Sequence, residues 1–170
     1  MDGKQVDRLL VKISCGDNAA FEELYECTKR GMFSFLYSYL KNYENTEDAM
    51  QTVYLKVKLS IGQYTHGTNG RAWLLQIAKN QALNELNKNK RVLYGDTVAA
   101  EEEPQLSGGV TEVMKRVLSE EERRIVTLHV LWGYKHREIA KELNCATGTV
   151  TSKYKRSIAK LKEALKEEEE

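Results

Sequence analysis

Proline is almost absent from this 170-residue chain, and so are the marks of a membrane, secreted or disulfide-bonded protein. No apolar run is long enough to span a bilayer, and the first residues lack the apolar block of a secretion signal. We therefore expect a cytoplasmic protein without membrane insertion. Its three cysteines, Cys15, Cys27 and Cys145, are far apart and form no C-x-x-C pair. They predict free, mostly buried thiols rather than a disulfide framework or a zinc site.

The single proline, Pro104, lies in the stretch VLYGDTVAAEEEPQLSGGVTE, which also holds glycines and three consecutive acids. This composition is typical of a linker. On either side the apolar spacing is helical, and neither an alternating strand pattern nor an internal repeat is present. The sequence thus predicts an all-α protein with two small domains, residues 1–92 and 112–170, joined by a flexible linker at 93–111.

Charge is unevenly distributed along the chain, although the net charge is only +1. Residues 71–91 carry five lysines and arginines against one glutamate, and residues 135–166 carry nine against three. Because phosphate neutralisation supplies much of nucleic-acid affinity, two basic segments suggest two sites for a polyanion. Two solvated helix faces would give the same pattern, and charge alone leaves both interpretations open.

Helix caps and apolar spacing outline the N-terminal domain. Asp17 or Asn18 can cap a helix from Ala19 toward Leu40, and Asn45 and Thr46 offer caps for the next helix. Along that second helix, apolar residues recur every four positions and predict a core stripe: Ala49, Val53, Val57 and Ile61. The other face carries a mixed polar and apolar strip that is either ordinary surface or a docking face for a partner: Asp48, Gln51, Thr52 and Leu55.

Glycines break the helical pattern at residues 60–70, which we expect to form a loop before a helix that begins near Arg71. That helix is rich in asparagine, a poor residue for a helix interior. Asn80, Asn84, Asn87 and Arg91 share one face. Amides beside cations can hydrogen-bond exposed base edges while the cations hold phosphates. Tolerated surface residues at a helix end are the alternative.

The C-terminal domain shows a helix-turn-helix pattern. Ser119, with Glu122 three residues later, predicts a capped helix, and HREIAKEL predicts a short one followed by a tight turn. A last helix opens at Thr147, with Val150 and either Tyr154 or Ile158 packed inward. The polar residues of this helix would remain available to a DNA major groove: Thr149, Thr151, Ser152, Lys153, Lys155 and Arg156.

Three segments, in order, resemble the extracytoplasmic function (group four) sigma factors of bacterial RNA polymerase, within the sigma-70 family. TEDAMQTVYLKV resembles the family's core-binding helix, with Asp48 and Gln51 at its hallmark positions. RAWLLQIAKNQALNELNKNKR resembles its promoter-melting helix, and EERRIVTLHVLWGYKHREIAKELNCATGTVTSKYKRSIAKL its C-terminal helix-turn-helix. Each motif alone is weak, but three in the family's order make coincidence an implausible explanation.

The resemblance implies a transcription initiation factor that binds polymerase core through the beta-prime clamp and beta subunits, directs it to a two-part promoter and helps to open the DNA. It assigns core binding to Asp48, Gln51, Thr52 and Leu55. It assigns binding of the unpaired minus 10 strand to nine residues of the loop and the following helix: Tyr64, Asn69, Trp73, Lys79, Asn80, Asn84, Asn87, Lys88 and Arg91. It assigns binding of the minus 35 duplex to residues of the last helix: Thr147, Thr149, Thr151, Ser152, Lys153, Lys155 and Arg156. An anti-sigma factor is a further implied partner.

Four positions depart from the family pattern: Asn84 replaces a frequent acid, Asn87 a usual arginine, Ser119 a common proline and Thr151 a frequent basic residue. Fewer arginines mean fewer bidentate base contacts, so these departures bear on promoter preference rather than on fold.

Two other classes of function remain to be weighed. A helix-turn-helix regulator could bind operators without ever serving as a sigma subunit. An enzyme is not expected, since His66, His129 and His136 are scattered along the chain, with no metal spacing, nucleophile elbow or phosphate loop, and no cofactor is indicated.

Overall fold

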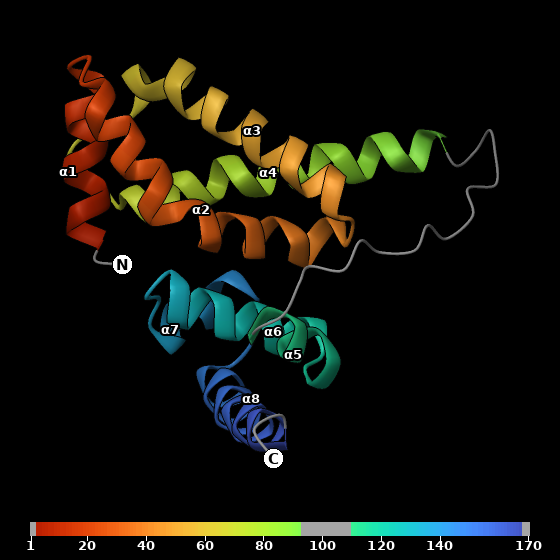
Figure 1. Cartoon of the computed structure of the whole chain (residues 1–170). Coiled ribbons are helices and arrows are strands. Elements are labelled where there is room, and N and C mark those ends of the chain that lie inside the picture. The colour runs from red at the N-terminus through yellow and green to blue at the C-terminus, as the bar shows by residue number, and fades with distance from the viewer. Residues whose placement is uncertain (1–2, 93–109, 168–170) are drawn as a thin grey trace. The chain divides into compact units, whose positions relative to one another are not determined.

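A computed structural model describes residues 3–92 and 110–167, and within these ranges every regular element is helical (Figure 1). The chain divides into two compact units, residues 1–103 and 104–170. The all-α, two-domain prediction is therefore confirmed. Most of the expected linker, with Pro104 and the acids before it, lies outside the described residues, as does the acidic end of the chain. Among the described helices, none combines the length and apolarity needed to cross a membrane.

The N-terminal unit contains α1 (Gly3–Ser14), α2 (Asn18–Leu40), α3 (Tyr43–Ser60), a 3-10 turn η1 (Ile61–Gln63) and α4 (Gly70–Val92). In Figure 1, α1 lies across one end of the group formed by α2, α3 and α4, and it contacts α2, α4 and η1. The predicted core stripe is confirmed at Ala49, Val53 and Val57, which are buried, whereas Ile61 is half-buried. Apolar residues of the other helices complete the core: Leu10, Leu24, Leu36, Leu74 and Ala78.

One of the two predicted caps in this unit is confirmed and the other is wrong. Asp17 caps α2, accepting a hydrogen bond from the Ala20 backbone N–H at 3.0 Å. Helix α3, however, is capped by Asn42, whose side chain accepts from the Asn45 N–H at 2.9 Å. Thr46 lies inside the helix, fully buried, and its hydroxyl donates to the Asn42 carbonyl at 2.6 Å. The helix therefore begins one turn earlier than its sequence suggested.

The C-terminal unit contains α5 (Val110–Val117), α6 (Glu120–Val126), a π-helical turn η2 (Thr127–Leu131), α7 (His136–Glu142) and α8 (Thr147–Glu167). Helix α8 packs against α5, α6 and α7. The core between them includes Trp132, Leu128, Ile139 and Val150, each fully buried. The tight turn between α7 and α8 contains Asn144, whose φ of 52° lies in the left-handed region that asparagine tolerates. This is the helix-turn-helix that the sequence predicted.

The cysteines are free, as expected, but the prediction that they are mostly buried is wrong. Cys15 and Cys27 are exposed, and Cys145 is half-buried. Cys15 follows the last turn of α1, and Cys27 lies on the outer side of α2 between the buried Leu24 and Thr28. The prediction relied on the general tendency of free cysteines to be buried and did not consider which face of its helix each cysteine occupies.

Candidate nucleic-acid interface

The outer face of α3 presents the strip that the sequence singled out as a docking face. Asp48, Gln51 and Leu55 are exposed, and the Leu55 side chain keeps 58% of its accessible surface. Thr52 is half-buried and donates its hydroxyl to the Asp48 carbonyl at 2.9 Å. Leu59, 77% exposed one turn beyond Leu55, extends the apolar part of this docking strip. Sequence reasoning missed Leu59, although its four-residue spacing from Leu55 places it on the same face.

Asparagines on α4 form an exposed row, which we call the amide face: Asn80, Asn84 and Asn87. The Asn80 carbonyl accepts a hydrogen bond from Gln76 at 2.9 Å. This leaves the Asn80 amide N–H groups without a partner among the described residues, and available to acceptor atoms of a ligand. Lys88 is exposed beside the row and pairs with Glu85 at 3.0 Å, while Lys79 is half-buried. The side chain of Arg91 lies outside the described residues.

Gln81, the amide next to Asn80, has a different role that the sequence did not reveal. It is buried, with 4% of its surface exposed. Its carbonyl accepts from the Lys56 ammonium on α3 at 2.5 Å, and its N–H donates to Glu85 at 2.8 Å. A buried polar group is costly unless its hydrogen bonds are made, so Gln81 stabilises the fold only while both bonds persist. Its bond to Lys56 therefore ties α4 to α3. The partner is 25 residues away in the sequence, so no local pattern signals it.

The loop 64–69, between η1 and α4, borders an open pocket of about 340 Å³. The pocket is lined by α1, the loop and the start of α4: Gly3, Lys4, Asp7, Gly67, Thr68, Asn69 and Arg71. The Asn69 side chain also caps α4, because its oxygen accepts from the Ala72 N–H at 3.2 Å. Tyr64 and Trp73 are both half-buried, and their rings contact each other with centroids 5.3 Å apart.

The loop and Asn80 are not at one point in the structure. Gly70 opens α4 and Asn80 follows ten residues later. At 1.5 Å per residue, the helix separates them by about 15 Å along its axis. The resemblance assigns both to the unpaired minus 10 strand, but a single base cannot reach across that distance, so the two would contact different nucleotides.

On α8, the exposed residues match the predicted recognition surface except at two positions. Thr147, Thr149, Ser152, Lys155 and Arg156 are exposed, while Val150 and Ser157 are fully buried. Thr151 and Lys153 are half-buried and engaged within the unit. Thr151 contacts the His136 Nδ1 at 3.0 Å, and Lys153 forms an ion pair with Glu121. Both would have to rearrange these contacts to meet DNA.

Two of the three histidines, described above as scattered, lie together beside this surface. The rings of His129 and His136 have centroids 4.7 Å apart, and both contact Tyr154 of α8. Burial and the neighbouring His129 lower the pKa of His136. Within the part of the chain that the structure describes, no group of three or more His, Cys, Asp and Glu is placed to hold a metal.

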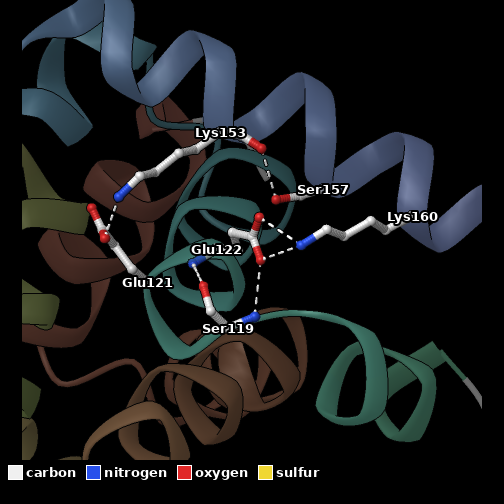
Figure 2. Close-up of polar contacts among 6 residues, drawn as sticks. All are labelled: Ser119, Glu121, Glu122, Lys153, Ser157 and Lys160. Atoms are coloured by element: carbon white, nitrogen blue, oxygen red, sulfur yellow. Dashed lines mark hydrogen bonds and ion pairs between the residues drawn. The ribbon is translucent and has the colours of Figure 1, made fainter.

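Glu122 joins α6 to α8, as Figure 2 shows. Its carboxylate accepts from the Ser119 backbone N–H at 2.9 Å and from the Lys160 ammonium at 3.0 Å, and Ser119 caps the Glu122 N–H in return. Burial alone would raise the pKa of Glu122, but the hydrogen bonds from Ser119 and Lys160 outweigh it, so the pKa lies below its usual value. The predicted capping box is thus confirmed, with an ion pair added.

Comparison with known proteins identifies both units. Residues 24–92 match the family Sigma-70 region 2, and residues 112–161 match Sigma-70, region 4. The chain is similar to the ECF RNA polymerase sigma factor SigK of Mycobacterium tuberculosis, with 25% identity covering 94% of this chain and 93% of that protein. It is also similar to the ECF RNA polymerase sigma factor SigX of Bacillus subtilis, with 24% identity covering 87% of this chain and 86% of that protein.

Two solved structures share the fold. One is CnrH in complex with the cytosolic domain of CnrY, with a TM-score of 0.57 and 17% identity, covering 95% of this chain and 97% of that chain. The other is the sigma factor RpoE in complex with the anti-sigma factor NepR from Bartonella quintana, with a TM-score of 0.61 and 24% identity, covering 86% and 96%. With region 2 and region 4 matched in order and full-length similarity to ECF proteins, this chain belongs to the extracytoplasmic function group of the sigma-70 family.

Proposed function

We propose that this chain binds bacterial RNA polymerase core as its sigma subunit, directs it to promoters with minus 10 and minus 35 elements, and promotes opening of the DNA. The observation that carries the proposal is the presence, on one chain, of region 2 with an exposed docking strip and amide face, and of region 4 with an exposed recognition helix. An operator-binding regulator needs only the second of these. The family acts in initiation without catalysing a reaction, and its place is the cytoplasm, with the polymerase.

Each interface takes a distinct part of the complex. The docking strip, Asp48, Gln51, Thr52 and Leu55, contacts the beta-prime clamp of the polymerase. The amide face and its flanking Lys79, Lys88 and Arg91 hold the unpaired minus 10 strand, with the cations on phosphates. The pocket beside the loop 64–69, which Asn69 lines, receives a different nucleotide from the one at Asn80, since about 15 Å of helix separates them. Tyr64 and Trp73 belong to the same minus 10 interface.

An anti-sigma protein is the regulatory partner that we propose. Both fold relatives were solved with a bound partner, the cytosolic domain of CnrY in one and the anti-sigma factor NepR in the other. The docking strip, with exposed Leu55 and Leu59, is an apolar surface that such a partner could cover in competition with core.

Purified chain added to sigma-free core polymerase is expected to give promoter-specific transcripts from a randomised duplex library. Changing Asp48 and Gln51 together to alanine is expected to weaken core association by about tenfold or more, because central interface residues each contribute more than about 1 kcal/mol. Helical content should not change, since both side chains are exposed.

The matched control removes two exposed acids from α2, Glu22→Ala with Glu26→Ala, to which no role is assigned. Core affinity should stay within about twofold of wild type in this control. Specific duplex binding without any core-dependent transcript would support the regulator instead. Equal core affinity for wild type and the Asp48 and Gln51 double variant would remove the docking strip from the interface.

Arg156→Ala is expected to cost roughly 1–3 kcal/mol of minus 35 affinity and to relax base preference at one position, because the exposed guanidinium can read a base edge. Lys155→Ala should instead weaken all sequences alike and reduce the salt dependence by about one counterion. Binding to a set of single-base variants of the selected promoter, at several salt concentrations, separates the two. If Arg156→Ala left affinity and base preference intact, the docking of α8 would be wrong.

A further inference from the structure

Helix α1 is attached to the loop 64–69 by a hydrogen bond between side chains that are 57 residues apart. The Tyr64 hydroxyl donates to the Asp7 carboxylate. A hydroxyl has one proton, and the carboxylate is a stronger acceptor than the Thr68 carbonyl, which lies 3.4 Å from the same oxygen. Burial, followed by the hydrogen bond to Asp7, raises the pKa of Tyr64 to about 12. The phenol therefore stays protonated and keeps donating throughout the physiological range.

The Tyr64 ring is held on the α4 side as well. Its centroid lies 5.3 Å from that of Trp73, at an interplanar angle of 57°. A side chain fixed at its hydroxyl by α1 and at its ring by α4 cannot turn outward without breaking both contacts. Tyr64 therefore has a fixed orientation in the loop and is not free to reorient and stack on a base.

Gly70 shows how closely α1, the loop and α4 converge. A Cβ at this position would lie 2.9 Å from the Leu10 Cδ1, 3.2 Å from the Tyr64 hydroxyl oxygen and 3.3 Å from the Asp7 backbone N. Its backbone φ is not in the left-handed region, so glycine is required here for space rather than for conformation. The three elements meet at one buried position, immediately where α4 begins.

Asp7 also lines the pocket beside the loop, together with Lys4 of α1 and Arg71 of α4. Helix α1 ends before residue 24, where the match to Sigma-70 region 2 begins, so it lies outside the matched segment. It nevertheless supplies part of the pocket wall and the acceptor that holds the loop.

We propose that α1 is a positioning element for promoter opening: Asp7, through Tyr64, holds the loop 64–69 in the conformation that captures an unpaired minus 10 nucleotide. Asp7 and Tyr64 act as positioning residues, because they fix the loop rather than read the base. This inference rests on the proposed sigma function and deepens it. Ordering the loop in advance lowers the entropic cost of capture, which otherwise falls on the binding step.

The test uses the full chain assembled with core polymerase, in four forms: wild type, Asp7→Ala, which removes the acceptor, Tyr64→Phe and the double variant. Tyr64→Phe keeps the ring contact with Trp73 and removes only the donor. Because a hydrogen bond to a charged group contributes more than one between neutral groups, each single variant is expected to bind a single-stranded minus 10 oligonucleotide from the selected promoter about tenfold more weakly. The double variant should lose no more than either single one, since both remove the same contact.

Two further readouts separate positioning from general destabilisation. Amide hydrogen exchange of residues 61–72 should rise in the variants while exchange in α2 stays constant, and binding to core and to upstream duplex should be unchanged. Tyr43→Phe is the matched control, since its hydroxyl is hydrogen-bonded to Glu47 on α3 and makes no contact with the loop. It should leave single-strand binding and loop exchange at wild-type values.

Gly70→Ala breaks the same junction by a different route, because the added methyl displaces Leu10 and the Tyr64 hydroxyl. It should reproduce the loss of single-strand binding. If the losses of the two single variants multiplied in the double variant, or if loop exchange were unchanged in Asp7→Ala, the inference would be overturned while the sigma function would stand. A wild-type chain that gives no promoter-specific transcript would overturn both.

Discussion

Glu122→Ala is expected to destabilise the C-terminal unit by roughly 2–3 kcal/mol, the sum of a lost helix cap and a lost charge-assisted hydrogen bond. Glu122 is 8% exposed, and removal of its carboxylate leaves the Ser119 N–H and one side of the Lys160 ammonium without that acceptor. A unit of this size has a small core, and such a loss is a large part of its stability.

Urea-dependent hydrogen exchange in α6 and α8 of the full chain measures this destabilisation, with α2 as the internal reference. Glu121→Ala is the matched control. Glu121 is the adjacent acid and pairs with Lys153, but its side chain is 46% exposed, so its loss should cost under about 1 kcal/mol. Equal costs for the two variants would contradict an anchoring role of Glu122.

Lowering the pH should destabilise the C-terminal unit through the same Glu122 carboxylate. Because the pKa of Glu122 is lowered in the folded unit, its contribution is fully present above the unfolded value of about 4.3 and is lost as pH falls toward the folded pKa. The pKa of His136 is lowered as well, so the folded unit favours its neutral form and loses stability as pH falls below about 6.5. Glu122→Gln should remove the lower step and keep the upper one.

Asn80→Ala is expected to reduce transcription about tenfold or more on a fully paired promoter and less on one with a pre-melted minus 10 bubble. An unpaired base no longer has to be unstacked, and unstacking costs a few kcal/mol in the duplex. In the proposed function the amide N–H groups of Asn80 hold such a base once it is exposed, since the Asn80 carbonyl already accepts from Gln76. Transcription from paired and bubble templates carrying each base gives the comparison.

Asn45→Ala is the control for this substitution, because it removes an exposed amide of the same unit from α3 rather than α4. It should leave both templates unaffected. A defect of Asn80→Ala that persists in the bubble and depends less on the base supplied would indicate reading of the captured base instead of opening. Normal transcription by the variant on every template would contradict both roles.

Features that depend on residues close together in the sequence, such as helix caps and tight turns, were predicted well. The box of Ser119 and Glu122 is confirmed because both partners lie within one turn, and the turn at Asn144 follows from asparagine's tolerance of a positive φ. The start of α3 was predicted wrongly because Asn42 and Asn45 offer the same cap, and the burial of Thr46 decides between them. Nothing in the local pattern could make that choice.

What the sequence could not predict depends on contacts between distant residues. The lysine that satisfies Gln81 comes from another helix, and the meeting of His129 with His136 follows the path of the chain around η2. The exposed faces of α3, α4 and α8 were predictable from periodicity, because their inward residues are apolar. Which polar residues beside these faces are already engaged, such as the half-buried Thr151 and Lys153, was not predictable.

The hydrogen bonds of Gln81 also fix the distance between two exposed surfaces of the N-terminal unit. Lys56 directly follows Leu55 of the docking strip, and Gln81 directly follows Asn80 of the amide face, so one part-buried hydrogen bond joins the neighbours of both surfaces. The spacing between the docking strip and the amide face is thereby set before any partner binds. If α3 binds the clamp and the amide face holds the unpaired strand, as proposed, the DNA must open at a defined distance from the clamp, and the more flexible DNA adapts to that distance.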